Sequence, residues 1–196
     1  MTGPGVAVDP IAWDPPFDWS CLFGRAGRVE VELGSGKGMF LKEAARRNSE
    51  TNYLGVERAG RYYQTALERL TRADATNVRL LRADGLGVLA RWVAPHSISC
   101  LHVYFPDPWP KKRHHKRRIF RPALLALALR ALAPAGEFRV ATDHAAYAEV
   151  IRDLFADESR FMPCPWGSDD AERLPTNYAL KWERAGRPLW WARYHC

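Results

Sequence analysis

Short β-prone runs alternate with helical patterns through most of this chain, and that alternation constrains the fold more than any other feature. Runs of branched and aromatic residues predict strands over 29–33, 53–56, 78–82, 97–105 and 137–141. Apolar residues at helical spacing predict helices over 39–47, 61–73, 87–92, 119–133 and 145–155. Strands that alternate with helices build a mostly parallel sheet with helices on both faces. The sequence therefore predicts an α/β fold.

The two ends of the chain depart from this alternation. Residues 1–27 are rich in Gly, Pro and Asp with scattered aromatic side chains, which predicts an irregular arm ahead of a single domain over 28–196. Near the C-terminus, residues 176–178 and an aromatic run over 189–194 could pair as antiparallel strands. We therefore expect a mostly parallel central sheet with an antiparallel C-terminal edge.

Acidic side chains follow four of the predicted strands. They are Glu57, Asp84, Asp107 and Asp143. A glycine turn over 34–38 follows the first strand. Ligands of open α/β sheets bind outside the carboxyl ends of the strands. The sequence therefore predicts one binding site at this edge of the sheet.

The glycine turn reads Gly-Ser-Gly-Lys-Gly. Gly34 and Gly36 permit a tight turn and the close approach of a ligand to the backbone. A dinucleotide-binding fingerprint would need a third glycine where Met39 stands. Glu32, just before the turn, would repel a pyrophosphate and attract a cation. This pattern favours S-adenosylmethionine, which carries an ammonium and a sulfonium group.

The acids after the second and third strands suit a nucleoside. Glu57, with Arg58 beside it, can accept hydrogen bonds from both hydroxyls of a ribose. Asp84 could receive an adenine amino group, or it could cap the helix that follows. We therefore place both residues and Arg58 in the expected cofactor site.

The stretch over 103–118 reads VYFPDPWPKKRHHKRR and joins a stiff turn to a basic block. Its prolines restrict the backbone around Asp107 and Trp109. Six of the eight residues over 111–118 are Lys or Arg, in a protein whose net charge is +7. Such a block can be a solvated surface, but beside an aromatic and acidic turn it favours phosphate binding by a nucleic acid. The candidate phosphate-binding residues are Lys111, Arg113, Lys116, Arg117 and Arg118.

Asp107 is the residue expected closest to the chemistry. The Watson–Crick edge of guanine offers two hydrogen-bond donors that one carboxylate can accept as a pair. Guanine N7 has a free lone pair, so its methylation requires no general base. Positioning and a nearby negative charge would suffice, because the purine becomes cationic as the methyl group moves.

Five segments together resemble the bacterial tRNA (guanine-N7-)-methyltransferase family: GRVEVELGSGKGMFL, YLGVER, FPDPWPKKRHHKRR, VATDH and PTNYALKWERAGRPLW. The resemblance implies a Rossmann-like class I methyltransferase fold, S-adenosylmethionine as cofactor, and tRNA as partner with methylation of a guanine in its variable loop. It assigns cofactor contacts to Glu32, Glu57, Asp84 and Asp107. It assigns substrate contacts to Lys111, Asp143, Thr176, Asn177, Tyr178 and Ala179.

Two positions depart from the family pattern. Ala179 stands where the family commonly has a glutamate, and Lys37 adds a cation to a glycine turn that often reads GFGMG. The alternatives are a methyltransferase that acts on another RNA or DNA base and a catalytically impaired RNA-binding relative, which Ala179 favours. An NAD-dependent dehydrogenase is disfavoured by Met39 and Glu32.

The cysteines and the apolar runs of the sequence bear on metal binding and on the location of the protein in the cell. The four cysteines are far apart and form no zinc-binding pattern with the histidines, so we expect reduced thiols and no metal. No leader or membrane-spanning run is apparent, which predicts a cytoplasmic protein without a membrane partner. We expect a monomer or homodimer with no obligate protein partner.

Overall fold

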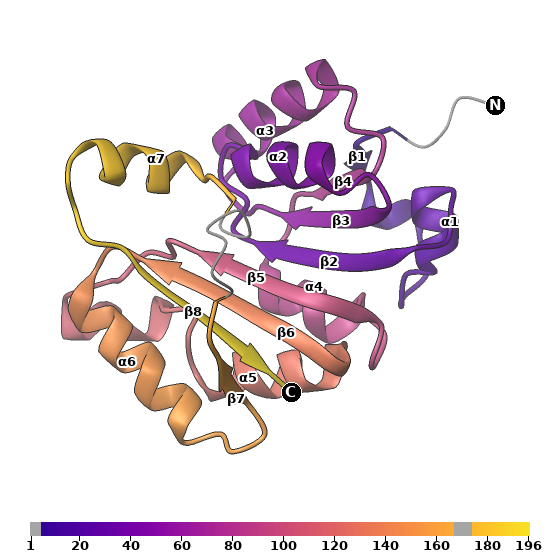
Figure 1. Cartoon of the computed structure of the whole chain (residues 1–196). Coiled ribbons are helices and arrows are strands. Elements are labelled where there is room, and N and C mark those ends of the chain that lie inside the picture. Colours follow the sequence, from indigo (N-terminus) through magenta and orange to yellow (C-terminus); the bar gives the residue numbers. More distant parts are fainter. Residues whose placement is uncertain (1–4, 167–173) are drawn as a thin grey trace.

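The computed structural model describes residues 5–166 and 174–196, and the strands of this part form one sheet (Figure 1). The strand order is β1-β4-β3-β2-β5-β6-β8-β7. The strands are β1 (Ala7–Val8), β2 (Arg28–Leu33), β3 (Thr51–Val56), β4 (Val78–Leu81), β5 (Ile98–Tyr104), β6 (Leu132–Thr142), β7 (Met162–Cys164) and β8 (Trp190–His195). The helices are α1 (Trp19–Phe23), α2 (Met39–Arg47), α3 (Gly60–Arg72), α4 (Gly85–Arg91), α5 (Pro122–Ala131), α6 (Ala145–Ala156) and α7 (Asn177–Arg184), with 3-10 helices η1 (Pro10–Ala12) and η2 (Lys112–Arg117).

The sheet is parallel except at β8. This strand pairs antiparallel with β6 on one side and with β7 on the other. The predicted α/β architecture with an antiparallel C-terminal edge is therefore confirmed. The prediction that residues 176–178 pair as a strand is wrong, because Thr176 caps α7 and the next two residues begin that helix.

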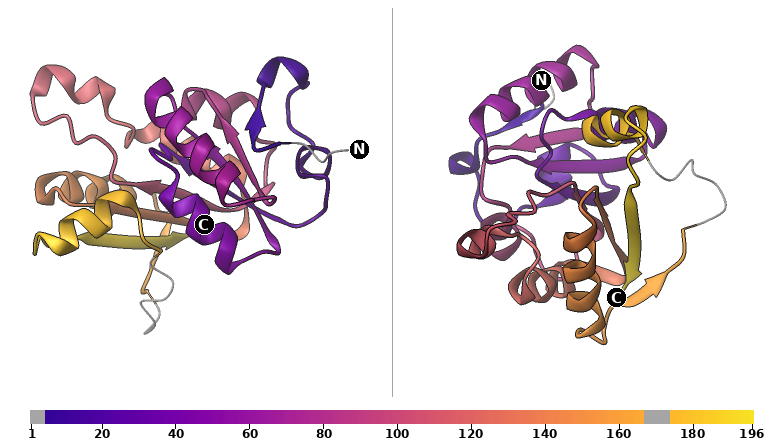
Figure 2. Two further views of the ribbon diagram at one scale, coloured as in Figure 1. Left: turned by 90° about the horizontal axis from the view of Figure 1, so that it is seen from above. Right: turned by 90° about the vertical axis from the view of Figure 1, so that its left-hand side faces the viewer.

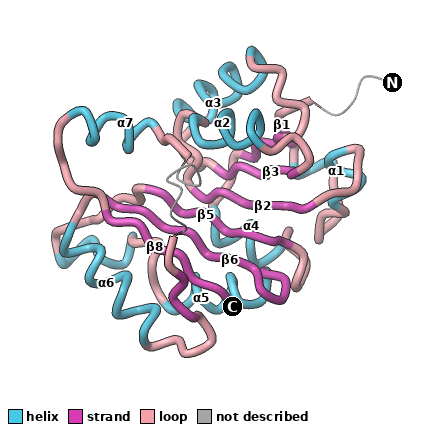
Figure 3. Tube along the Cα trace, in the orientation of Figure 1, coloured by secondary structure: helices cyan, strands magenta, loops and turns pink. Residues whose placement is uncertain are grey.

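Helices cover both faces of the sheet (Figure 3). One apolar cluster joins the sheet to α4, α5 and α6, and a second joins it to α2, α3 and α7. Successive strand residues point to opposite faces. Val29, Val31 and Leu33 of β2 therefore pack in the first cluster, while Glu30 and Glu32 point to the face that α2 covers.

The N-terminal arm contains three short regular elements. It contains β1, η1 and α1, and β1 extends the sheet by pairing parallel with β4. The buried guanidinium of Arg79 on β4 donates to the carbonyl oxygens of Leu22 and Phe23 at 2.8 and 3.1 Å. The ring of Phe17 stacks on Trp92 at 4.8 Å. The arm is irregular in sequence, but these distant contacts order it.

The described part of the chain contains no helix long and apolar enough to cross a bilayer. The four cysteines are all unpaired. Two pieces project from the same end of the molecule, the segment that holds η2 and the helix α7 (Figure 2, left).

Candidate active site

Two cavities adjoin at the carboxyl ends of the central strands. The small cavity has a volume of about 250 Å³ and is lined by Glu32, the glycine turn and the start of α7. The large cavity, of about 730 Å³, is lined by Glu57, Asp84 and Asp107 together with the end of the basic block. The two share the residues Gly34, Gly36, Tyr62, Tyr104, Phe105 and Tyr178. A ligand that fills both would pass over the glycine turn.

The glycine turn leaves room for such a ligand. Gly34 has φ +79° and Gly36 has φ +53°, conformations that side chains other than glycine rarely adopt. A Cβ added to Gly34 would meet no atom within 4 Å, so the space above the backbone is open. The N–H groups of Gly34 and Ser35 donate to the carbonyl oxygen of Val56, which holds the turn against β3.

Glu32 is a buried acid, and one of its two carboxyl oxygens lacks a hydrogen-bond partner in the described part of the chain. Its side chain is 4% exposed, and its Oε2 has no hydrogen-bond partner in the described part of the chain. Burial raises the pKa of Glu32 from its ordinary value of 4.5 to about 8, against a hydrogen bond from Ser35 that lowers it. An ammonium group in the small cavity would supply the missing partner. The site therefore fits the amino-acid group of S-adenosylmethionine.

Glu57 is held rigidly at the end of β3. Its Oε2 accepts from the N–H of Gly36 at 2.8 Å, and its Oε1 accepts from the N–H of Ala59 at 2.6 Å. Each carboxylate oxygen has a second lone pair, so Glu57 can still accept from ribose hydroxyls. Arg58 lines the same large cavity.

Asp84 is the N-cap of α4, as one of its two sequence interpretations predicted. Its Oδ2 accepts from the N–H of Gly87 at 3.0 Å. The residue also lines the large cavity, and its Oδ1 takes no part in the cap. Capping and nucleoside binding are therefore compatible at this position.

The basic block folds back onto the turn that carries Asp107. Arg118 Nε donates to the carbonyl oxygen of Pro108 at 2.8 Å, and its guanidinium lies 4.9 Å from the ring centre of Tyr147. Arg117 lies 4.9 Å from the ring centre of Trp109. These contacts hold the end of the block against the turn, while most of its other cations are exposed. Asp107 itself is exposed and lines the large cavity.

The candidate phosphate-binding residues do not all face the large cavity. Lys116, Arg117 and Arg118 line it. Lys111 and Arg113 are exposed beside it without lining it. Because Arg118 is engaged with the turn, its main structural role is to hold Asp107 and Trp109 in place.

The C-terminal motif lies at the junction of the two cavities. Thr176 Oγ1 accepts from the N–H of Ala179 at 2.9 Å, and Asn177 Oδ1 accepts from Arg69 Nη1 at 3.2 Å, which ties α7 to α3. Tyr178 is 45% exposed and stacks on Phe105 with 6.0 Å between ring centres. Ala179 is 2% exposed and packs in the second apolar cluster.

Burial and nearby acidic groups raise the pKa of Tyr178. Burial raises its pKa first, and the nearby Tyr62, Asp107 and Asp143 raise it further. Asp143 thus acts on Tyr178 through its charge, although it lines neither cavity. Sequence reasoning missed Tyr62, which is 41% exposed and lines both cavities, because nothing in the local pattern of α3 distinguishes it from a surface residue.

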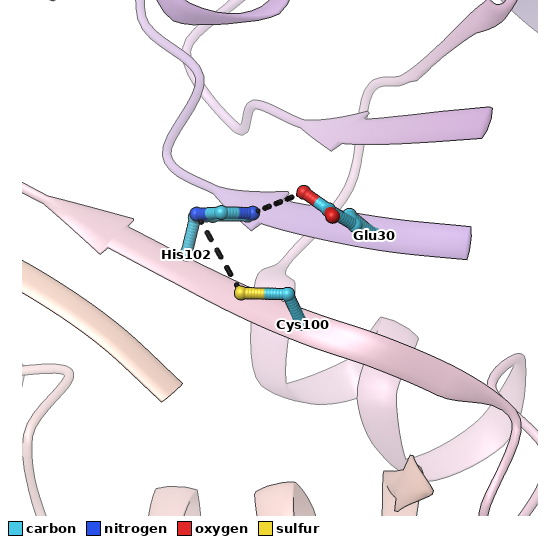
Figure 4. Close-up of side chains that lie close together, drawn as sticks. All are labelled: Glu30, Cys100 and His102. Atoms are coloured by element: carbon cyan, nitrogen blue, oxygen red, sulfur yellow. Dashed lines mark hydrogen bonds and ion pairs between the residues drawn. The ribbon is translucent and has the colours of Figure 1, made fainter. Parts of the chain in front are cut away.

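Glu30 on β2 and Cys100 and His102 on β5 form a polar cluster (Figure 4). Glu30 Oε2 is 2.8 Å from His102 Nε2, while Tyr104 Oη and Cys100 Sγ lie 2.9 and 3.9 Å from His102 Nδ1. Burial lowers the pKa of His102, so the neutral ring donates from Nε2 to Glu30 and accepts from Tyr104 at Nδ1. Glu30, Cys100 and His102 are the residues of metal-ligand type that gather in the described chain. Their ligand atoms lie within 4.8 Å of one another, with the acid and the thiol on opposite ring nitrogens of His102.

Comparisons of the sequence with known proteins identify relatives of this chain. A family model described as "Putative methyltransferase" matches residues 26–192. The tRNA (guanine-N(7)-)-methyltransferase of Mycobacterium avium (strain 104) is 40% identical over 185 residues, which cover 93% of this chain and 71% of that protein. The protein of the same name from Corynebacterium diphtheriae is 42% identical over 183 residues, which cover 89% and 68%.

Solved structures share the fold. The 16S rRNA methyltransferase KamB superposes with a TM-score of 0.63 at 14% identity, over 93% of this chain and 94% of that one. A SAM-dependent methyltransferase from Aquifex aeolicus gives a TM-score of 0.59 at 9% identity, over 86% and 82%. These likenesses confirm the class I methyltransferase architecture. Because the long sequence matches add a specific family to that fold, the chain belongs to the tRNA (guanine-N7)-methyltransferase family.

Proposed function

We propose that this protein transfers a methyl group from S-adenosylmethionine to N7 of a guanine in the variable loop of tRNA. One observation carries the proposal. Glu57, Asp84 and Asp107 line the same cavity as Lys116 and Arg117, so acids suited to a nucleoside and cations suited to phosphates face one space. The identity of 40% to a curated tRNA (guanine-N(7)-)-methyltransferase supports it.

The cofactor lies across both cavities in this proposal. Glu32 binds its ammonium group, Glu57 its ribose hydroxyls and Asp84 its adenine amino group, with Arg58 along the wall. When bound, S-adenosylmethionine supplies a methyl group on a positively charged sulfur. The rigid backbone contacts of Glu57 hold that acid in position before the cofactor arrives, which lowers the cost of ordering it.

The target guanine lies against the turn at the end of β5. Its N7 lone pair attacks directly, so the protein has to place the base and stabilise the charge that develops on it. Asp107 accepts from the guanine donors and offsets that positive charge. Tyr178, stacked on Phe105, provides an aromatic surface at the junction of the cavities. Asp143 and Lys111 contact the flanking nucleotide.

Residues of a single chain perform all of these proposed roles. The proposed reaction therefore needs no second subunit and no obligate protein partner. Attack by a free lone pair needs no Lewis acid, so we propose no metal. We propose a cytoplasmic site of action, because tRNA is the substrate.

The decisive experiment is nucleoside analysis of bulk tRNA after incubation with the protein and labelled S-adenosylmethionine. The expected product is 7-methylguanosine. Label in an adenine or cytosine derivative would show that another base is the target. Tight tRNA binding with no label incorporated would identify a catalytically impaired RNA-binding relative, and both results would overturn the proposal.

The basic block should hold tRNA by neutralising phosphates. Lys112, Arg113 and Lys116 are exposed, unlike Arg118, so alanine at all three should leave the Asp107 turn intact. We expect the slope of log affinity against log salt to flatten by roughly two to three units, because each phosphate contact releases counterions. Filter binding over a salt series measures it.

A matched control removes equal charge elsewhere. Alanine at Arg46, Arg47 and Arg72, which are exposed on α2 and α3, should leave the slope within about half a unit of the unmodified protein. An unchanged slope in the η2 variant would show that this block is not the docking surface.

A further inference from the structure

The small cavity contains charges of both signs. Its charged lining residues are Glu32, Lys37 and Lys181. The ammonium of the cofactor accounts for Glu32, but the two lysines have no part in the proposed reaction so far. A cavity with two ammonium groups and an acid that ionises beside a bound ammonium is complementary to a zwitterion, and an α-amino acid is a zwitterion at neutral pH.

The two lysines approach the cavity from different elements. Lys37 lies in the glycine turn between Gly36 and Gly38, both of which have positive φ. Lys181 lies four residues after Asn177 on α7, and residues at that spacing share one face of a helix. Both Asn177 and Lys181 line the cavity, while α7 lies beyond the carboxyl ends of β2 and β3 (Figure 1).

The α7 side of the cavity is held in place. The hydrogen bond from Arg69 to Asn177 ties α7 to α3, and the ammonium of Lys181 lies 4.3 Å from the ring centre of Trp182. This cation–π contact limits the conformations of the lysine without neutralising it. Neither Lys37 nor Lys181 forms an ion pair with an acid in the part of the chain that the structure describes. Both charges are therefore available to an anion.

We propose that Lys37 and Lys181 bind the carboxylate of the amino-acid group of S-adenosylmethionine while Glu32 binds its ammonium. The inference rests on the proposed function and assigns residues to one end of the same cofactor. It gives Lys37, a departure from the usual glycine turn, a defined role. With these assignments, α7 contacts the cofactor through Lys181 and contributes to the tRNA site as well.

The test compares S-adenosylmethionine with its decarboxylated form, which keeps the ammonium and the sulfonium but lacks the carboxylate. Calorimetry would give both dissociation constants for the unmodified protein, Lys37→Met, Lys181→Met and the double variant. We expect the double variant to bind S-adenosylmethionine about tenfold more weakly and the decarboxylated form within about twofold of the unmodified protein. Lys42→Met, a partly exposed lysine of α2 outside the cavity, is the matched control and should change neither constant.

Binding of the decarboxylated form also reports whether each variant is folded. Equal losses for both ligands, or no loss for either, would overturn the inference while leaving the proposed function intact. No loss for either ligand together with a flatter salt dependence of tRNA binding would assign the lysines to tRNA phosphates instead. Failure of the unmodified protein to bind either ligand would overturn both the inference and the proposed function.

Discussion

Glu32→Gln is expected to weaken S-adenosylmethionine binding roughly 10- to 100-fold and to stabilise the unliganded protein. The loss of affinity follows from removing the charged partner of a buried ammonium, a contact on the order of 1.5–3 kcal/mol. The gain in stability follows because the carboxylate is 4% exposed, its Oε2 lacks a partner, and its pKa is raised to about 8. Calorimetry and chemical denaturation measure the two effects.

The direction of the stability effect follows from the raised pKa. Folding holds Glu32 protonated up to about pH 8, whereas the unfolded chain releases that proton near 4.5. The protonated carboxyl group therefore makes its full contribution to the free energy of unfolding below pH 4.5, and this contribution is lost as the pH rises to about 8. The glutamine side chain does not ionise, so the free energy of unfolding of the variant should exceed that of the unmodified protein by on the order of 3 kcal/mol at pH 7. Equal stability of the two proteins between pH 5 and pH 8 would contradict the shifted pKa.

Cofactor binding should depend on pH for the same reason. An ammonium needs the carboxylate form of Glu32, so binding releases a proton, and affinity should rise about tenfold per pH unit from pH 6 towards the pKa of about 8. Calorimetry in two buffers of different ionisation enthalpy counts the protons released. Asp84→Asn is the matched control, which should bind more weakly but keep the same pH dependence, because Asp84 is not among the groups that shift the pKa of Glu32. If the affinity of the unmodified protein for S-adenosylmethionine did not depend on pH, Glu32 would not be the residue that binds the ammonium group.

Asp107→Asn is expected to lower the rate of methyl transfer at least 100-fold, the scale of losing one group that stabilises developing charge. Its effect on tRNA affinity should stay within about twofold, because the contact with phosphates that we propose comes mainly from the exposed cations of η2. Single-turnover kinetics with saturating tRNA and filter binding separate the two quantities. Asp153→Asn, an exposed acid of α6 outside both cavities, should leave both unchanged.

Two outcomes would contradict the role proposed for Asp107 in methyl transfer. Full activity of Asp107→Asn would show that it does not act on the transition state. Equal loss of rate and of tRNA affinity would show that it positions the turn as a whole, in the way that Arg118 does through the carbonyl oxygen of Pro108. Neither outcome alters the family to which the chain belongs.

Local signals in the sequence determined the fold class and the edge of the sheet where the site lies. The alternation of strands and helices depends on the spacing of apolar residues, and Gly34 and Gly36 mark a turn that only a permissive backbone can make. Acids that follow parallel strands must gather at one edge. The order of residues along the chain was therefore enough to place Glu57, Asp84 and Asp107 together, and all three line the large cavity.

Tertiary structure alone decided the features that depend on contacts between distant residues. The pairing of β1 with β4 joins segments about 70 residues apart, and the bond from Arg69 to Asn177 spans 108 residues. Tyr62 and Lys181 enter the site from helices whose local sequences resemble any amphipathic surface helix. The burial of Glu32 depends on what packs around it, because a pKa follows solvation and neighbouring charge, which only the folded chain supplies.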